Sequence, residues 1–238
     1  MTAVLLMYML EEEAFFALQT LLRGDKFRFA ARMEPGFPDL QMNFWVHEQL
    51  MIKYLPKLDA YFAGPPEMDD DQGVARQKLF KHRVKFPNFP DMVQLRPNMY
   101  CHRWYMMAFL DELPLETCYR VWDVLFLEGS QILYSVALTI LRLAEPHLLK
   151  MPFDQVMGFF CSGSEHELKQ RIAGDADAFM KEVLSQRIKP ATIKALEAIY
   201  DRDHSQARAD KSATMRALRD ADKPEPKVKG KTNGKSKV

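Results

Sequence analysis

Apolar residues between positions 101 and 141 recur at intervals of three and four, the spacing that places them along one face of an α-helix. Period-two runs rich in Val, Ile and Thr, which predict strands, are missing from the chain. The sequence therefore predicts an all-α fold with no sheet. The three stripes are Cys101, Trp104, Tyr105, Ala108 and Phe109; Leu115, Cys118, Tyr119, Trp122, Leu125 and Phe126; and Ile132, Leu133, Val136, Ala137, Ile140 and Leu141.

Residues that start and stop helices separate these stripes. Pro114 suits the first turn of the second helix, and Gly129 is expected to end it. Ser130 is expected to cap the third helix and Pro146 to close it.

Before these stripes the chain predicts two helices. The first is expected to run from the start to about Arg23, and Asp39 is expected to cap the second. Pro56 predicts a kink or an early end within the second helix. The apolar positions of the second helix are Phe44, Met51, Leu55, Leu58 and Phe62.

The first ten residues are apolar on nearly all sides and lack a polar cap. Such a helix is normally buried among other elements, whereas chain termini usually lie at the surface. We therefore expect a fold truncated at its N-terminus, with the natural start further upstream. The alternative is a chain that simply begins with a core helix.

Composition changes twice along the rest of the chain. Proline-rich residues 64–98 predict an insertion loop with one short helix, carrying an acidic run and then a basic cluster from Arg76 to Lys85. We expect the domain to cover residues 1–200, with its last packed helix from Pro190 to Tyr200. Residues 201–222 then predict a charged helix or linker, and Lys-rich residues 223–238 a disordered basic tail.

Bulk properties narrow the class of protein further. The 238 residues are 47% apolar, enough for a sizeable core, and carry a formal net charge of +1. Such balance gives no overall attraction to nucleic acid. The opening apolar run is too short to span a bilayer and has no basic approach, so we expect a soluble cytoplasmic chain without a signal peptide.

No metal or cofactor site emerges from the motifs. Cys101, Cys118 and Cys161 are odd in number and widely spaced, which favours reduced, buried thiols over a disulfide or metal pair. His47 and Glu48 are not followed by a second histidine at the spacing of zinc proteases, and no glycine loop for phosphate is present.

Four short motifs make the sequence specific. They are Tyr100-Cys-His-Arg-Trp104-Tyr105, Leu113-Pro114-Leu115-Glu116, Arg120-Val121-Trp122-Asp123 and Leu127-Glu128-Gly129. In order and spacing this run resembles the Y-x-S-Q-W-F, L-P-L, R-I-W-D and EG signature of the TBC (Tre-2/Bub2/Cdc16) domain. The resemblance covers roughly residues 1–200, outside the insertion.

The resemblance implies an all-helical domain that accelerates GTP hydrolysis by Rab-type GTPases and so regulates vesicle trafficking, without a cofactor of its own. The family supplies an arginine from I-x-x-D-x-x-R and a glutamine from Y-x-Q-G-M, and neither motif occurs in these 238 residues. We therefore assign no catalytic residue. Three hypotheses follow: a GTPase activator whose catalytic half is missing here, a non-catalytic GTPase-binding or scaffold remnant, and an unrelated helical interaction module.

The signature residues Tyr100, Trp104, Pro114, Arg120, Trp122, Asp123 and Gly129 are interpreted as structural. Trp104 and Trp122 lie on apolar stripes and are expected in the core, while Arg120 and Asp123 are expected to pair. His102 and Arg103 replace the family's usual Ser and Gln and are the candidate partner-facing residues; drift at a tolerant position is the equal alternative. The basic cluster and the lysine tail favour solvated segments, with weak peripheral contact to endomembranes as the alternative.

Overall fold

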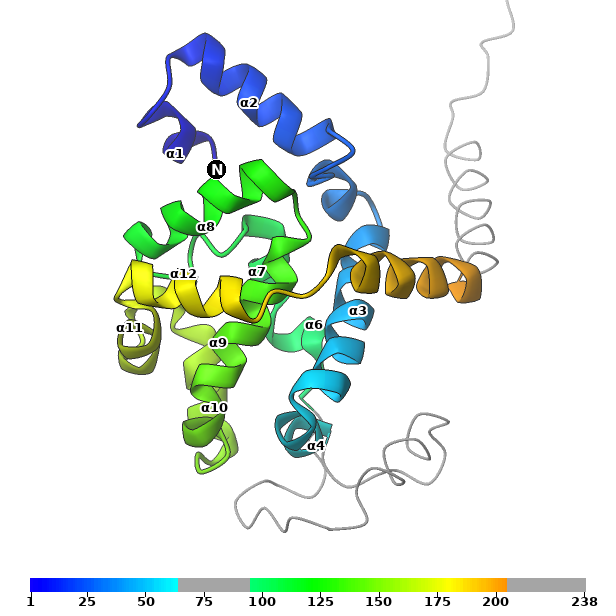
Figure 1. Cartoon of the computed structure of the whole chain (residues 1–238), viewed down its shortest axis with the longest axis vertical. Helices are drawn as coiled ribbons and strands as arrows, with labels where there is room; N and C mark the ends of the chain where they lie inside the picture. Colours follow the sequence, from blue (N-terminus) through cyan, green and yellow to red (C-terminus); the bar gives the residue numbers. More distant parts are fainter. Residues whose placement is uncertain (64–94, 205–238) are drawn as a thin grey trace, which may run out of the picture. The chain divides into compact units, whose positions relative to one another are not determined.

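The computed structural model describes residues 1–63 and 95–204, and these are helical with no strand (Figure 1). The all-α prediction is confirmed. The helices are α1 (Thr2–Leu6), α2 (Glu11–Arg23), α3 (Pro38–Tyr54), α4 (Pro56–Ala63), α6 (Pro97–Tyr100), α7 (His102–Met107), α8 (Leu115–Glu128), α9 (Ile132–Leu148), α10 (Phe153–Cys161), α11 (Glu167–Ala173) and α12 (Ala176–Ser185), with 3₁₀ turns at Ala30–Met33 and Gly163–Glu165 and a further helical stretch at 190–204.

The chain divides into two compact units, Met1–Tyr200 and Asp201–Val238. Of the second unit, residues 201–204 are described and are helical. The tail expected at 223–238, and the insertion expected at 64–98 as far as position 94, lie outside the described residues. Position 95 is already part of the packed unit, because Leu95 is buried and its N–H donates to the carbonyl of Phe62.

Helix α9 is the central helix of the first unit. Every residue from 132 to 141 is buried, which is the pattern of a helix covered on all sides. It contacts α3, α7, α8, α11 and α12. Val136 and Ile140 are buried there, as are Trp104 and Trp122, so these four predicted core positions are confirmed. Leu115, the first residue of the second predicted stripe, is instead 49% exposed at the start of α8.

Several predicted helix ends are wrong. The opening helix is two helices, because Leu10 is extended (ψ 158°) and its N–H donates to the carboxylate of Glu13 at 3.1 Å, which starts α2 anew. Pro146 does not close α9, which continues through the last turn to Leu148. Ser130 does not cap α9; its hydroxyl donates to the carbonyl of Lys26 at 3.4 Å.

Two further expectations about helix ends need correction. The first apolar stripe breaks because α7 ends at Met107, and Ala108 and Phe109 then adopt left-handed backbone angles, φ 48° and 63°. Asp39 does not cap α3; it lies in the first turn and forms an ion pair with Arg28 at 2.9 Å. Other ends agree with the prediction, since α2 ends at Arg23, Gly129 ends α8, and Pro56 separates α3 from α4.

The opening residues are not buried on all sides as their composition suggested. Leu5 is 2% exposed, but Leu6 is 48% exposed and Met7 is 65% exposed. Only one side of α1 therefore faces the core of its unit.

A buried polar network joins α3 to α6 and α7. The ring of His47, 0% exposed, bonds the hydroxyl of Tyr105 through Nδ1 (2.7 Å) and the hydroxyl of Tyr100 through Nε2 (2.9 Å). The Tyr100 hydroxyl also lies 3.0 Å from the sulfur of Met51, a weak acceptor, which favours the proton of His47 on Nε2 and a bond from Tyr105 to Nδ1. Burial lowers the pKa of His47 to about 3, which keeps the ring neutral.

This network predicts a specific pH dependence of stability. The pKa of His47 rises from about 3 in the folded chain to its ordinary 6.5 on unfolding, so the unfolded chain binds more protons between these values. The free energy of unfolding should fall as pH drops below 6.5, by at most about 1.4 kcal/mol per pH unit from this group. Replacing His47 by Gln should flatten the profile between about pH 6.5 and 5, measured by urea unfolding.

The matched control is His102→Gln, because His102 is exposed at the start of α7. It should leave the pH profile unchanged. Identical slopes for wild type and His47→Gln would show that His47 is not buried in its neutral form.

Candidate functional site

The signature tryptophans anchor the region around α7 and α8. Trp104 is 0% exposed and contacts the rings of Tyr100, Phe109 and Phe160, with centroids 5.5–5.9 Å apart. Its indole N–H is buried and has no hydrogen-bond partner. Trp104 therefore acts through packing alone.

Trp122 is buried like Trp104 but also forms a hydrogen bond. Its indole N–H donates to the buried carbonyl of Ala108 at 3.0 Å. Ala108 and Phe109 are the two left-handed residues after α7, a conformation that costs non-glycine residues energy unless the surroundings hold it. This bond ties α8 to that turn and connects the motif containing Trp104 to the motif containing Trp122.

Gly129 ends α8 where Lys26 lies close. Its φ is +93°, and a Cβ there would lie 2.6 Å from Cγ of Lys26, so a side chain is excluded on both counts. The ammonium of Lys26 donates to the last carbonyls of α8, those of Phe126 (3.1 Å) and Leu127 (2.5 Å). A cation at the negative end of the helix dipole stabilises this end.

The remaining signature residues are Pro114, just before α8, and Arg120 and Asp123, which are exposed on α8. Pro114 immediately precedes the helix with an extended backbone. Arg120 forms an ion pair with Asp177 of α12 at 3.2 Å, so the expected pairing with Asp123 is wrong: the guanidinium reaches a neighbouring helix. Asp123 is exposed. Because both partners of the Arg120 pair are largely exposed, it adds little to stability.

The two candidate partner-facing residues differ in how firmly they are held. His102 is exposed, whereas Arg103 is half-buried and bonds Asp111 at 2.6 Å. The Asp111 hydrogen bond raises the pKa of Arg103, which therefore stays charged. The guanidinium is thus fixed along this edge.

A buried ion pair lies directly behind this edge. Lys169 of α11 donates to Oε2 of Glu112 at 2.5 Å, and both side chains are 2% exposed. The other oxygen of Glu112, Oε1, lies 3.9 Å from Nε of Arg103. Burial lowers the pKa of Lys169, and Glu112 partly opposes that shift. Removing one partner would leave the other charge buried, so this pair holds α11 against the Arg103 edge.

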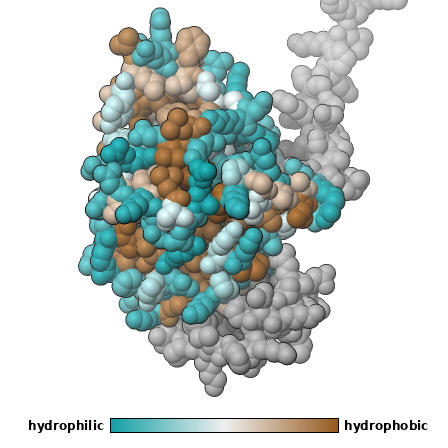
Figure 2. Space-filling model, in the orientation of Figure 1, coloured by the Kyte–Doolittle hydropathy of each residue, from teal (hydrophilic) through white to brown (hydrophobic). Residues whose placement is uncertain are grey.

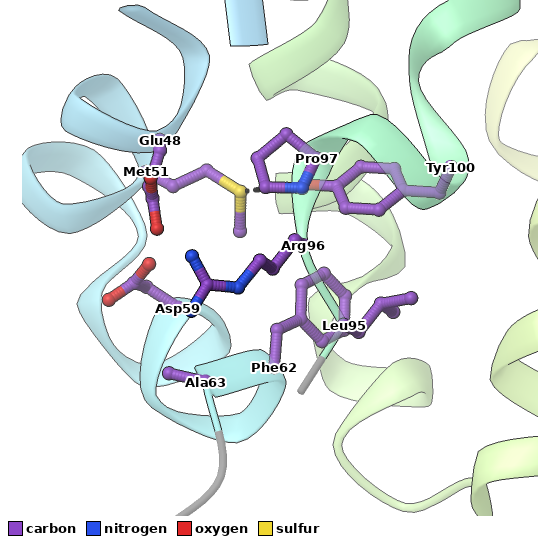
Figure 3. A pocket seen from close by; sticks show the side chains of 9 residues that line it. All are labelled: Glu48, Met51, Asp59, Phe62, Ala63, Leu95, Arg96, Pro97 and Tyr100. Carbon is purple, nitrogen blue, oxygen red and sulfur yellow. Dashed lines mark hydrogen bonds between the residues drawn. The ribbon is translucent and has the colours of Figure 1, made fainter. Parts of the chain in front are cut away.

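A small cleft lies between α4 and α6. Figure 3 shows the guanidinium of Arg96 extending between the carboxylates of Glu48 and Asp59, above Phe62. The enclosed space is about 20 Å³, room for about one water molecule and far too little for a nucleotide or organic cofactor.

The described ranges hold no cluster of three His, Cys, Asp or Glu side chains suited to a metal ion. Nor does any helix within 1–63 and 95–204 have the length and apolar character to cross a bilayer. The three cysteines are free, and Cys101 and Cys118 are buried, while Cys161 is exposed, contrary to expectation. Burial raises the pKa of Cys118 to about 12, so it is not a thiolate nucleophile.

Three features of this region were missed in the sequence. They are the Lys26 cap, the Glu112–Lys169 pair and the His47 network. A signal existed only for His47, which lies between the apolar positions Phe44 and Met51 at helical spacing. The other two join residues more than 50 positions apart, so no local pattern reveals them.

Comparison with known proteins gives consistent matches. The family model of the Rab-GTPase-TBC domain matches residues 1–149. Growth hormone-regulated TBC protein 1-A of Danio rerio is 30% identical over 163 residues, 66% of this chain and 44% of the relative. TBC1 domain family member 12 of Xenopus tropicalis is 28% identical over 172 residues, 72% of this chain and 21% of the relative. The chain thus spans less than half the length of either relative.

The two tryptophans allow a matched test of the Trp122 bond. Both Trp122→Phe and Trp104→Phe shorten a buried tryptophan to the same side chain, but only Trp122→Phe removes the N–H donor of the Ala108 carbonyl, which then keeps only the weak S–H donor of Cys118 at 3.9 Å. Trp122→Phe should therefore cost about 1–3 kcal/mol more in the free energy of unfolding than Trp104→Phe. Urea unfolding followed by circular dichroism measures this difference. Equal costs would mean that the indole bond contributes nothing.

Proposed function

This chain belongs to the Rab-GTPase-TBC domain family, and we propose that it binds a Rab-family small GTPase and takes part in regulating vesicle trafficking. The family match over residues 1–149 carries the proposal. The signature residues pack together around α7 and α8, and this shared structural role of the four motifs supports the proposal. By the same reasoning we place the protein in the cytoplasm, working peripherally on endomembranes.

The edge formed by His102 and Arg103 is our candidate for part of the GTPase contact. His102 is exposed, and Arg103 is held in place by Asp111. A side chain that is already ordered loses less conformational freedom on binding, which favours affinity. Surface charge of this kind chiefly sets the rate and specificity of association.

We propose further that the 238-residue chain binds without accelerating hydrolysis. Phosphoryl transfer needs an arginine in trans to stabilise charge and a group to orient the attacking water. The chain contains neither family motif that supplies them. In addition, Arg28, Arg103 and Arg120 are engaged with Asp39, Asp111 and Asp177, so each would have to leave a carboxylate to act as a finger.

A non-catalytic scaffold is the second candidate function. The ion pairs of Arg28 and Arg103 favour it, because an arginine held by a carboxylate suits a fixed binding contact better than the role of a mobile catalytic arginine. If the chain binds a GTPase and leaves its rate of GTP hydrolysis unchanged, the result agrees with both candidate functions. A full-length protein that also leaves hydrolysis unchanged would select the scaffold.

The activity prediction is tested by single-turnover GTP hydrolysis across a panel of Rab proteins, with the chain in excess. We expect rates within about twofold of the intrinsic rate, because binding alone adds little to the chemical step. Stimulation of about a hundredfold or more would show that one of the arginines in this chain acts in trans.

The binding prediction concerns Arg103. Replacing Arg103 by Ala should weaken binding to the cognate Rab by about fivefold or more, measured by biolayer interferometry across the same panel. The control is Arg187→Ala, which removes another exposed arginine from an ion pair, that with Glu128. Equal affinities for the two variants would remove Arg103 from the interface, and no binding to any Rab would refute the proposed function.

A further inference from the structure

The ion pair between Lys169 and Glu112 is buried, although charged side chains ordinarily lie at the protein surface. Figure 2 shows the ordinary pattern, with hydrophilic residues over much of the face in view. Within residues 1–63 and 95–204, no other lysine and no other glutamate is buried. Apolar side chains of similar size often stabilise a core as well as such a pair does. The pair is therefore a candidate for a role beyond stability.

Arg103 lies between two carboxylates. Its guanidinium bonds Asp111 at 2.6 Å at the surface, and its Nε lies 3.9 Å from Oε1 of Glu112. That oxygen is buried and has no hydrogen-bond partner among the described residues, while Oε2 accepts from Lys169. The 3.9 Å separation is about 1 Å longer than an N–H···O hydrogen bond. A small movement of the Arg103 side chain would therefore bring it from Asp111 to Glu112.

The ammonium of Lys169 decides this competition. Burial lowers the pKa of Lys169, Glu112 opposes that shift and Arg103 adds to it, so the three charges act on one another. While Lys169 is charged it compensates Glu112, and Arg103 gains little by leaving Asp111. Without that ammonium Glu112 would be an uncompensated buried carboxylate, which is strongly destabilising. Arg103 then supplies the missing charge, because its Nε already faces Oε1.

We propose that Lys169 is a positioning residue, which occupies Glu112 and thereby keeps Arg103 paired with Asp111 at the surface. The inference rests on the proposed function, which places a GTPase contact at Arg103. Loss of the Lys169 ammonium turns Arg103 inward to Glu112 and withdraws it from that contact. Lys169 lies on α11, whereas Arg103 lies on α7, so the attachment of α11 controls the edge.

Two substitutions that break the same ion pair should therefore have different effects on binding to the cognate Rab. Lys169→Met leaves Glu112 charged and should weaken binding about fivefold or more, as Arg103→Ala should. Glu112→Gln removes the competing charge and still offers Lys169 an acceptor, so affinity should stay within about twofold. The double variant Lys169→Met/Glu112→Gln should also bind within about twofold of wild type. Equal losses for the two single variants would overturn the proposal.

Thr117→Val is the matched control for loosening of α11. The buried hydroxyl of Thr117 donates to the carbonyl of Ala173 at the end of α11, at 2.5 Å, and carries no charge. Thr117→Val should unfold at a lower urea concentration but bind the Rab within about twofold of wild type. A loss of binding as large as that of Lys169→Met would show that any loosening of α11 moves the edge, which contradicts a specific role of Lys169.

Urea unfolding tests the exchange of partners without a GTPase. Arg103→Ala should shift the midpoint little in the wild-type chain, because the pair with Asp111 is partly exposed. In the Lys169→Met chain the shift should be at least about twice as large, because Arg103 then compensates Glu112. Equal shifts in the two backgrounds would overturn the proposal, as would a Lys169→Met chain that fails to fold while Lys169→Met/Glu112→Gln folds. If the wild-type chain binds no Rab, the proposed function fails, and the urea comparison still decides whether Arg103 reaches Glu112.

Discussion

The indole N–H of Trp122 and the carbonyl of Ala108 form the contact on which the signature region depends. Two consecutive non-glycine residues, Ala108 and Phe109, hold left-handed backbone angles in the core. Such angles persist only where surrounding contacts outweigh their cost. The 3.0 Å bond from α8 supplies one such contact and is the strong donor to a buried carbonyl, whose other donor is the weak S–H of Cys118 at 3.9 Å. It lies where α7 ends and the loop to α8 begins.

That turn connects the buried core to the surface edge. Glu112 follows it and forms the buried pair with Lys169, while Asp111 holds Arg103 at the edge. At its other end α8 is capped by Lys26, just before the close approach that requires Gly129. The motifs shared with the Rab-GTPase-TBC domain family thus mainly hold neighbouring helices and loops together. The proposed GTPase contact lies on their exposed side.

Local sequence patterns predicted the helices well where apolar spacing is strong. The stripe from Ile132 to Leu141 and the two tryptophans were placed in the core correctly, because apolar residues recur there with helical spacing. The burial of the positions between the stripe residues, such as Ser135 and Thr139, was not predicted. The errors came from contacts between distant residues. Ser130 bonds Lys26 instead of capping α9, and Arg120 reaches Asp177 instead of Asp123. The left-handed turn after Met107 has no glycine to signal it. Of the candidate site, the residues were found in the sequence, but the support of Arg103 by Asp111 was not.

If the Trp122 bond is a fixed part of the folded core, its indole proton must be protected from solvent. Hydrogen exchange of the three indole N–H groups, followed by ¹⁵N NMR, measures this protection. Trp122 is 3% exposed and bonded, while Trp45 is only half-buried. We expect the Trp122 indole proton to exchange only through global unfolding, at the rate of the most protected core amides, and the Trp45 proton to exchange faster. A Trp122 indole proton that exchanges as fast as that of Trp45 would show that this bond is not a fixed part of the core.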